Sequence, residues 1–142
     1  MSNTLLRISL LSWFAVQLIK TVICRVQYKK WDYKKLFESG GMPSAHCAFV
    51  SSLTYGIACK YGSSSSFFTI ALCFSLIVMY DAMGVRNEAG KHAKILNIIQ
   101  KKIPIAEKTE LTECLGHKPI EVFWGAVSGV GISAVSQMFV TL

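Results

Sequence analysis

One short segment of this chain combines residue types that suit phosphate chemistry. Residues 40–46 read Gly-Gly-Met-Pro-Ser-Ala-His and are followed directly by an apolar stretch. Because proline is favoured in the first turn of a helix, we predict a helix start here, with first N–H groups that lack partners inside the helix. Such a terminus binds anions, and glycines ahead of it let a ligand approach the backbone. Ser44 and His46 would add a hydroxyl and a titratable ring, but a plain turn that caps a membrane helix fits these residues equally well.

A second histidine, His117, precedes the last apolar stretch. Pro119 follows it after two residues and Glu121 after four. Since proline suits an early helix position, His117 is expected just outside the helix, with Glu121 about one turn along. A carboxylate within reach of an imidazole fixes its tautomer and favours its charged form, which is how a histidine is activated as a base or nucleophile. A simple hydrogen bond at a helix start is the more common alternative for such a pair.

The composition places both histidines in a membrane protein. Of the 142 residues, 52% are hydrophobic and 16% are charged, whereas charged residues make up about 25% of a soluble domain. Four stretches are long enough to cross about 30 Å of hydrocarbon, namely residues 5–24, 45–61, 67–84 and 120–142. We therefore predict an all-α integral membrane bundle of about four transmembrane helices, which forms a single domain over residues 1–142.

The basic residues indicate an orientation in that membrane. The chain has 15 Lys and Arg, and all except Arg7, Lys20 and Lys60 fall in the two long segments that connect the predicted spans on one side. The positive-inside rule places these segments in the cytoplasm and both termini on the opposite face. Residues that bind a phosphate would bias the count in the same direction. We expect a protein of the inner cell membrane with both histidines on the cytoplasmic side.

Between the third and fourth spans the sequence predicts an interfacial amphipathic helix. Apolar residues recur at helical spacing between residues 85 and 103, and basic residues occupy the other faces. This pattern is typical of a helix that lies along a membrane surface, with its lysines near anionic headgroups of membrane lipids. A membrane location also explains the net charge of +7. We expect no nucleic acid partner, because no nucleic-acid-binding motif accompanies that charge.

Three blocks of the sequence together resemble a known family. Pro-Ser-Ala-His at residues 43–46 is similar to the Pro-Ser-Gly-His signature of the type 2 phosphatidic acid phosphatases, which are relatives of the vanadium haloperoxidases. His117 and Glu121 resemble the second histidine and the aspartate of another signature of that family, with Glu in place of Asp. Tyr-Asp-Ala-Met-Gly-Val-Arg at 80–86 and Leu-Gly-His at 115–117 make the chain most similar to the small divergent, YuiD-like branch.

This resemblance implies a membrane phosphatase that acts on a lipid phosphate monoester or pyrophosphate. His117 would attack phosphorus and form a phosphohistidine, Glu121 would orient its ring, and His46 would protonate the leaving oxygen. The phosphate oxygens would be bound by the side chains of Lys20, Ser44 and Arg86 and by backbone N–H groups near Gly41 and Ala45. The resemblance implies no cofactor and no metal. The alternative is a noncatalytic membrane protein that keeps the fold and binds lipid phosphates.

His92 competes with His117 for the catalytic role. Arg86 and His92 have five residues between them, which matches the spacing of an arginine and a histidine in the parent family. The fourth residue after His92 is Leu96, so no carboxylate orients that ring. We therefore interpret the signature as split, with Arg86 supplying the guanidinium and His117 supplying the nucleophile.

Two further charged residues lie near predicted membrane segments. Lys20 is close to the end of the first span, where an ammonium group either binds an anion or snorkels to the surface. Asp81 is close to the end of the third span and would support the site or pair with Arg86. Both residues are therefore candidates for the site.

Small residues line one face of the last span. Gly125, Gly129 and Ser133 recur at intervals of four residues. Such a face lets helices approach closely, either inside the bundle or between two copies in a homo-oligomer. We expect packing inside the bundle as the default, because the helices must surround two histidines without large gaps.

Overall fold

The computed structural model describes residues 3–28, 41–103 and 109–140, and every regular element in these ranges is a helix. In chain order the helices are α1 (Thr4–Tyr28), α2 (Ala45–Tyr61), α3 (Ser66–Met83), α4 (Val85–Lys102) and α5 (Pro119–Val140). The four stretches expected to cross the membrane coincide closely with α1, α2, α3 and α5. The amphipathic segment forms α4.

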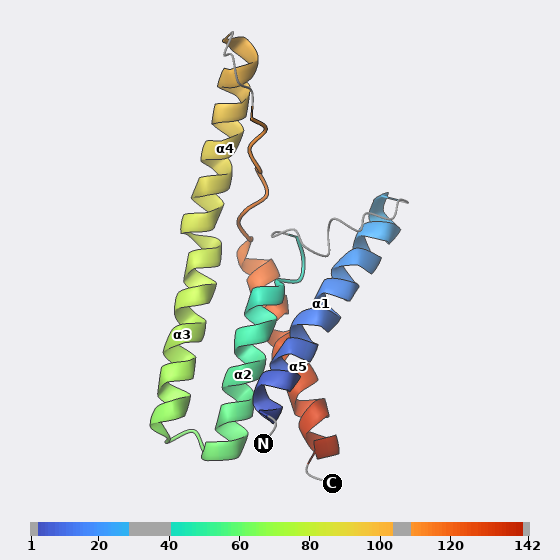
Figure 1. Ribbon diagram of the computed structural model, residues 1–142, viewed down its shortest axis with the longest axis vertical. Helices are drawn as coiled ribbons and strands as arrows, with labels where there is room; N and C mark the ends of the chain where they lie inside the picture. Colours follow the sequence, from blue (N-terminus) through green and yellow to red (C-terminus); the bar gives the residue numbers. More distant parts are fainter. Residues whose placement is uncertain (1–2, 29–40, 104–108, 141–142) are drawn as a thin grey trace.

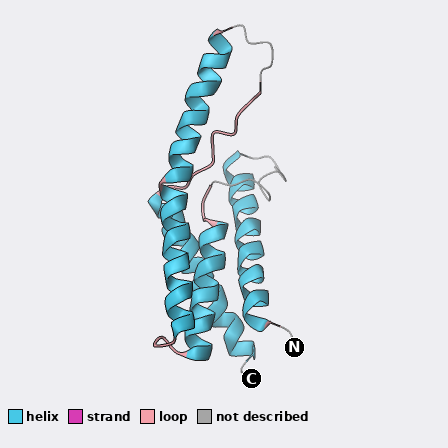
Figure 2. Cartoon of the chain, turned by 60° about the vertical axis from the view of Figure 1, so that its left-hand side comes forward, coloured by secondary structure: helices cyan, strands magenta, loops and turns pink. Residues whose placement is uncertain are grey.

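Helix α2 is the central element of the bundle and contacts α1, α3 and α5 (Figure 1). The end of α1 and the starts of α2 and α5 lie at one end of the bundle, which we call the histidine end. Both chain termini and the turn at residues 62–65 lie at the opposite end, which we call the far end (Figures 1 and 2). This arrangement agrees with the expected topology, in which both termini face the same side.

The helices fit a membrane protein. Three helical stretches are long and apolar enough to cross a membrane, namely Thr4–Ile23, Ser66–Lys102 and Pro119–Phe139. Helix α2 is shorter, with 17 residues, but it runs from the histidine end to the far end beside α3 and so crosses the same thickness. The prediction of an all-α membrane bundle is therefore confirmed.

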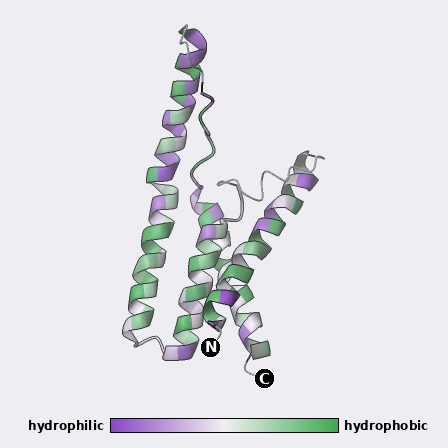
Figure 3. Ribbon diagram, in the orientation of Figure 1, coloured by the Kyte–Doolittle hydropathy of each residue, from purple (hydrophilic) through white to green (hydrophobic). Residues whose placement is uncertain are grey.

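The course of α4 differs from the expected one. Instead of turning across the ends of the spans, α4 continues the direction of α3 as one long rod, broken only at Gly84 (Figures 1 and 2). The rod becomes more polar along α4, as the colours of Figure 3 show. The segment 109–116 runs back along α4, and the Asn97 amide holds it through both backbone groups of Leu111 at 2.8 and 3.0 Å. This segment covers the face of α4 that carries its small residues. It leaves the apolar residues of α4, such as Leu96 and Ile99, exposed.

The small-residue face of α5 packs inside the bundle, against α2. A side chain at Gly129 would collide with the backbone of Ala48, and the Ser133 hydroxyl donates to the Ser52 carbonyl at 3.1 Å. Gly125 and Gly129 are buried, and Ser133 has no exposed surface. These residues therefore pack inside the bundle, which is the default expectation.

We expect Gly129→Ala to lower the free energy of unfolding by about 1–3 kcal/mol, because the new methyl group pushes α2 and α5 apart. Gly131 on the same helix is the matched control, since a methyl group there meets nothing within 4 Å. Gly131→Ala should be neutral or stabilise by up to about 1 kcal/mol, through the better helix propensity of alanine. Unfolding of the purified variants in detergent measures both effects. Equal effects of the two substitutions would contradict the packing described here.

Candidate active site

The start of α2 is built around Ser44. Its hydroxyl accepts the N–H of Cys47 at 3.4 Å, and its own N–H donates to the carbonyl of Glu121 at 3.0 Å. Pro43 therefore precedes the cap and does not lie in the first turn, which corrects the expected position. Ser44 has no exposed surface. The expected contact between its hydroxyl and a phosphate is therefore not supported, because that hydroxyl caps the helix inside the protein.

Backbone donors remain at the same helix start. The N–H groups of Ala45 and His46 make no hydrogen bond among the described residues, as expected for a first turn. Gly41 lies just ahead with a φ of 79°, in the left-handed region that glycine adopts without strain. A Cβ atom on Gly41 would lie 3.6 Å from Cε of Lys20. The glycine therefore brings the backbone ahead of α2 close to the Lys20 side chain.

The start of α5 holds His117 firmly. Its Nδ1 atom lies 2.9 Å from Oε2 of Glu121, and its backbone N–H donates to the Ala82 carbonyl at 3.0 Å. Oε2 also accepts the Lys118 N–H at 3.2 Å, which is half of a capping box, with glutamate at the third helical position. Glu121 therefore orients the imidazole and caps α5 at the same time.

This pairing leaves one ring nitrogen of His117 free. An ionised carboxylate only accepts hydrogen bonds, so in the neutral ring Nδ1 carries the proton and Nε2 keeps its lone pair. The Nε2 atom makes no hydrogen bond among the described residues and is not fully enclosed, although only 4% of the His117 surface is exposed. Nε2 thus keeps some accessible surface in a ring that is otherwise buried.

The His46 ring lies within electrostatic range of three charged or titratable side chains from different parts of the chain, namely Lys20, Arg86 and His117. They come from α1, the first turn of α4 and the residue pair ahead of α5, whereas His46 itself belongs to α2. His92 is not among these groups and lies exposed on α4, within electrostatic range of Glu88. The structure thus brings the expected residues together and leaves the competing histidine outside.

The two cations of the site are held differently. Arg86 donates from Nε to Oδ2 of Asp81 at 2.7 Å, which confirms the expected pair, and both side chains are partly exposed. Because Asp81 uses Nε, the terminal nitrogens of the guanidinium are left for other acceptors. Only 6% of Lys20 is exposed. Such burial contradicts the alternative that its ammonium group snorkels into water.

Several positioning contacts were not predicted from the sequence. The Ala82 carbonyl anchors His117, and a side chain at Gly116 would collide with the backbone of Asn87. A side chain at Gly125 would collide with the Ser44 carbonyl, so this glycine lets α5 approach the start of α2. The glycines beside His117 and one turn after Glu121 were the available signals. Backbone carbonyls such as that of Ala82 leave no signal in a sequence.

Comparison with known proteins identifies the family of this chain. The divergent PAP2 family matches residues 1–132. An uncharacterized membrane protein of Bacillus subtilis (strain 168), YuiD, is 36% identical over 153 residues, which cover 98% of this chain and 97% of that protein. No solved structure matches the chain. The chain is a membrane protein that belongs to the divergent PAP2 family.

Proposed function

We propose that this protein is a membrane phosphatase that hydrolyses a lipid phosphate monoester or pyrophosphate. One observation carries the proposal: His46 lies within electrostatic range of Arg86, Lys20 and a His117 ring whose accessible nitrogen is backed by Glu121. A nucleophile, an orienting carboxylate, a second titratable ring and two cations are groups that can transfer a phosphoryl group through a phosphohistidine.

In the first step, the Nε2 lone pair of His117 attacks phosphorus. A P–N bond forms as the bond between phosphorus and the leaving oxygen breaks. His46, as imidazolium, gives its proton to that oxygen, and the lipid alcohol or lipid monophosphate leaves. Glu121 accepts from Nδ1 and stabilises the positive charge that develops on the His117 ring.

In the second step, water hydrolyses the phosphohistidine. Neutral His46 accepts a proton from the water as its oxygen attacks phosphorus, and the P–N bond breaks. Inorganic phosphate leaves, and both rings return to their starting states. The sum of the steps is one water consumed for each phosphate released.

The phosphate group is bound by positive charge and backbone donors. The Lys20 ammonium group adds positive charge within electrostatic range of His46. Arg86 offers its terminal guanidinium nitrogens, and Ala45 and His46 offer their free N–H groups at the start of α2. These donors stabilise the negative charge on the equatorial oxygens in the transition state. The negative charge of the bound phosphate in turn favours the imidazolium form of His46.

The proposed site lies at the membrane surface that carries the basic segments. Residues 85–102 alone contain Arg86 and four lysines, and these are Lys91, Lys94, Lys101 and Lys102. By the positive-inside rule we assign this surface to the cytoplasmic side of the inner membrane. A lipid phosphate in that leaflet would present its headgroup at the depth of the two histidines.

Two observations favour a second candidate, a noncatalytic protein that binds lipid phosphates. The Ser44 hydroxyl is used inside the protein, and Asp81 partly neutralises the charge of Arg86. A site in which fewer protein groups than expected are free to bind phosphate loses turnover more easily than it loses binding.

Binding of vanadate separates the two candidates, because vanadate adopts the trigonal-bipyramidal geometry of the phosphoryl transition state. A phosphatase should bind vanadate about 10²-fold or more tighter than phosphate. Glu121→Gln should weaken vanadate about tenfold and phosphate less, since the amide no longer stabilises charge on His117. Arg86→Ala should weaken both anions alike. Calorimetric titration of the purified proteins measures these constants, and equal affinities of the wild type for the two anions would establish the binding protein instead.

A further inference from the structure

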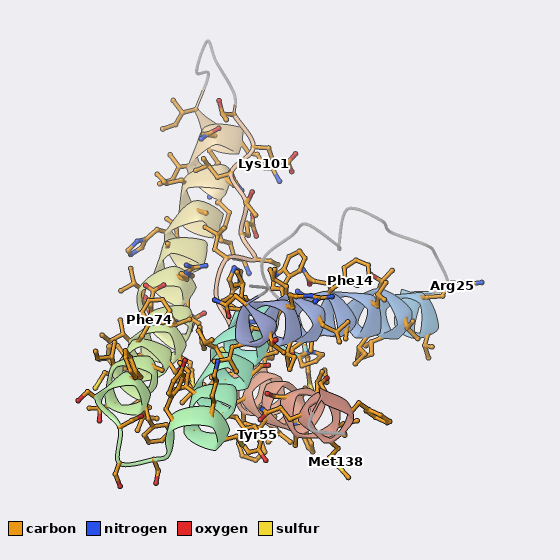
Figure 4. All side chains as sticks on the ribbon, turned by 60° about the horizontal axis from the view of Figure 1, so that its bottom comes forward. Phe14, Arg25, Tyr55, Phe74, Lys101 and Met138 are labelled. Carbon is orange, nitrogen blue, oxygen red and sulfur yellow. The ribbon has the colours of Figure 1, made fainter. Side chains whose placement is uncertain are left out.

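Two apolar grooves lie at the far end of the bundle, away from the candidate active site. The first groove, of about 500 Å³, runs between α1, α2 and α5 and is lined by Tyr55, Ala134 and Met138 among others. Figure 4 shows Tyr55 on α2 and Met138 on α5 on the same side of the bundle. The second groove, also about 500 Å³, runs between α1, α2 and the start of α3, beside Ile57 and Phe67. Both volumes are in the range of about 300–1,000 Å³ found for ligand sites.

The two grooves meet at one place. Thr4, Leu5 and Lys60 line both of them. Leu5 packs against α2 at Gly56, where a Cβ atom would lie 2.9 Å from the leucine side chain. The first turn of α1 therefore separates two apolar channels that share a single cation at their common end.

The far end has positive charge without an acidic counterpart. Lys60 lies over the ring of Tyr61 at 5.2 Å and makes no ion pair among the described residues. No Asp or Glu occurs in residues 3–24, 41–80 or 122–140, which supply α2 and most of α1, α3 and α5. An anion at Lys60 must therefore come from outside these segments. At the surface of a bilayer, lipid phosphate groups are the abundant anions.

We propose that one anionic phospholipid of the far-end leaflet binds here, with its phosphate at Lys60 and one acyl chain in each groove. Two apolar channels that share one cation match a lipid in which two chains share one headgroup. Because this lipid bridges α1 and α2, its binding stabilises the folded bundle. The inference does not depend on the proposed phosphatase activity, since the grooves lie at the opposite end.

Lipid titration of the full-length protein in detergent tests the charge at Lys60. Phosphatidylglycerol should raise the melting temperature in a saturable way, at lower concentration than zwitterionic phosphatidylcholine. Lys60→Gln should weaken the apparent affinity for phosphatidylglycerol about fivefold, the effect of one basic residue near a lipid surface. Arg7→Gln is the matched control at the same end, because Arg7 lines neither of the two grooves, and it should leave the affinity unchanged within about twofold. Equal affinities for the two lipids, or equal effects of the two substitutions, would overturn the proposal.

A comparison of lipids with one and with two acyl chains tests the role of the grooves. Wild-type protein should bind phosphatidylglycerol more tightly than its single-chain lyso form, and Ala134→Phe should remove this preference by filling the first groove. Val135→Phe is the control, since Val135 is exposed on the neighbouring face of α5 and lines neither groove. If the folded Ala134→Phe protein keeps the preference for two chains, the proposed binding mode is wrong. If that variant does not fold, the Lys60 and Arg7 pair still decides the proposal.

Discussion

His117→Ala should lower phosphate release from a lipid phosphate by about 10⁴-fold or more, as expected when a covalent nucleophile is removed. No other described histidine ring is hydrogen-bonded to a carboxylate, although the exposed His92 lies within electrostatic range of Glu88. The assay follows inorganic phosphate from phosphatidic acid, phosphatidylglycerol phosphate and polyprenyl pyrophosphate in detergent micelles. The wild type should release phosphate from at least one of them.

His92→Ala is the matched control for this substitution. His92 is exposed on α4, outside the group of residues around His46, so its loss should leave most of the activity. Acid-labile phosphate trapped on the wild type, and lost in His117→Ala, would identify the phosphohistidine. If His92→Ala abolishes release and His117→Ala does not, the assignment of the nucleophile is wrong. If the wild type releases phosphate from none of the three lipids, the noncatalytic candidate is favoured.

His46→Ala should lower release from a lipid phosphate by about 10²-fold or more, because the leaving alkoxide is no longer protonated. The size of this loss should depend on the leaving group. A phenolate such as p-nitrophenolate leaves without protonation, so the loss should be much smaller with p-nitrophenyl phosphate. Comparing kcat/KM for the two substrates isolates the first step, in which the leaving group departs, from the hydrolysis of the phosphohistidine that both substrates share.

The same comparison with His117→Ala supplies the control for His46. Loss of the nucleophile should reduce turnover of both substrates alike, since both must form the phosphohistidine. A loss in His46→Ala that is equal for the two substrates would assign His46 to phosphate binding rather than to proton transfer. Melting temperatures of both variants near that of the wild type would exclude unfolding as the cause.

Local spacing alone was sufficient to predict the helices and the residue pairs within one turn of each other. Apolar stretches of the right length become α1, α2, α3 and α5 because burying or membrane-embedding them is favourable wherever they pack. Glu121 lies one turn after His117, and the two side chains meet at 2.9 Å. Asp81 and Arg86 meet at 2.7 Å across Gly84 for the same reason, their closeness in sequence.

The same local reasoning was wrong or incomplete where a group has two possible partners. The Ser44 hydroxyl can serve a ligand or the backbone, and burial against α5 decides for the backbone. Helix α4 can turn along a membrane or continue α3. The return segment 109–116, held by Asn97, covers its small face, and this contact accompanies the straight course.

The sequence by itself therefore determined which residues are the candidates for the proposed chemistry and which helices hold them. Only the tertiary structure decided that His117, Arg86 and Lys20 lie within electrostatic range of His46, since the four residues come from separate parts of the chain. A stripe of small residues predicts close packing but not the helix it will meet. The physical reason for the convergence is the fit of Gly125 and Gly129 against the backbone of α2, which brings the starts of α2 and α5 together.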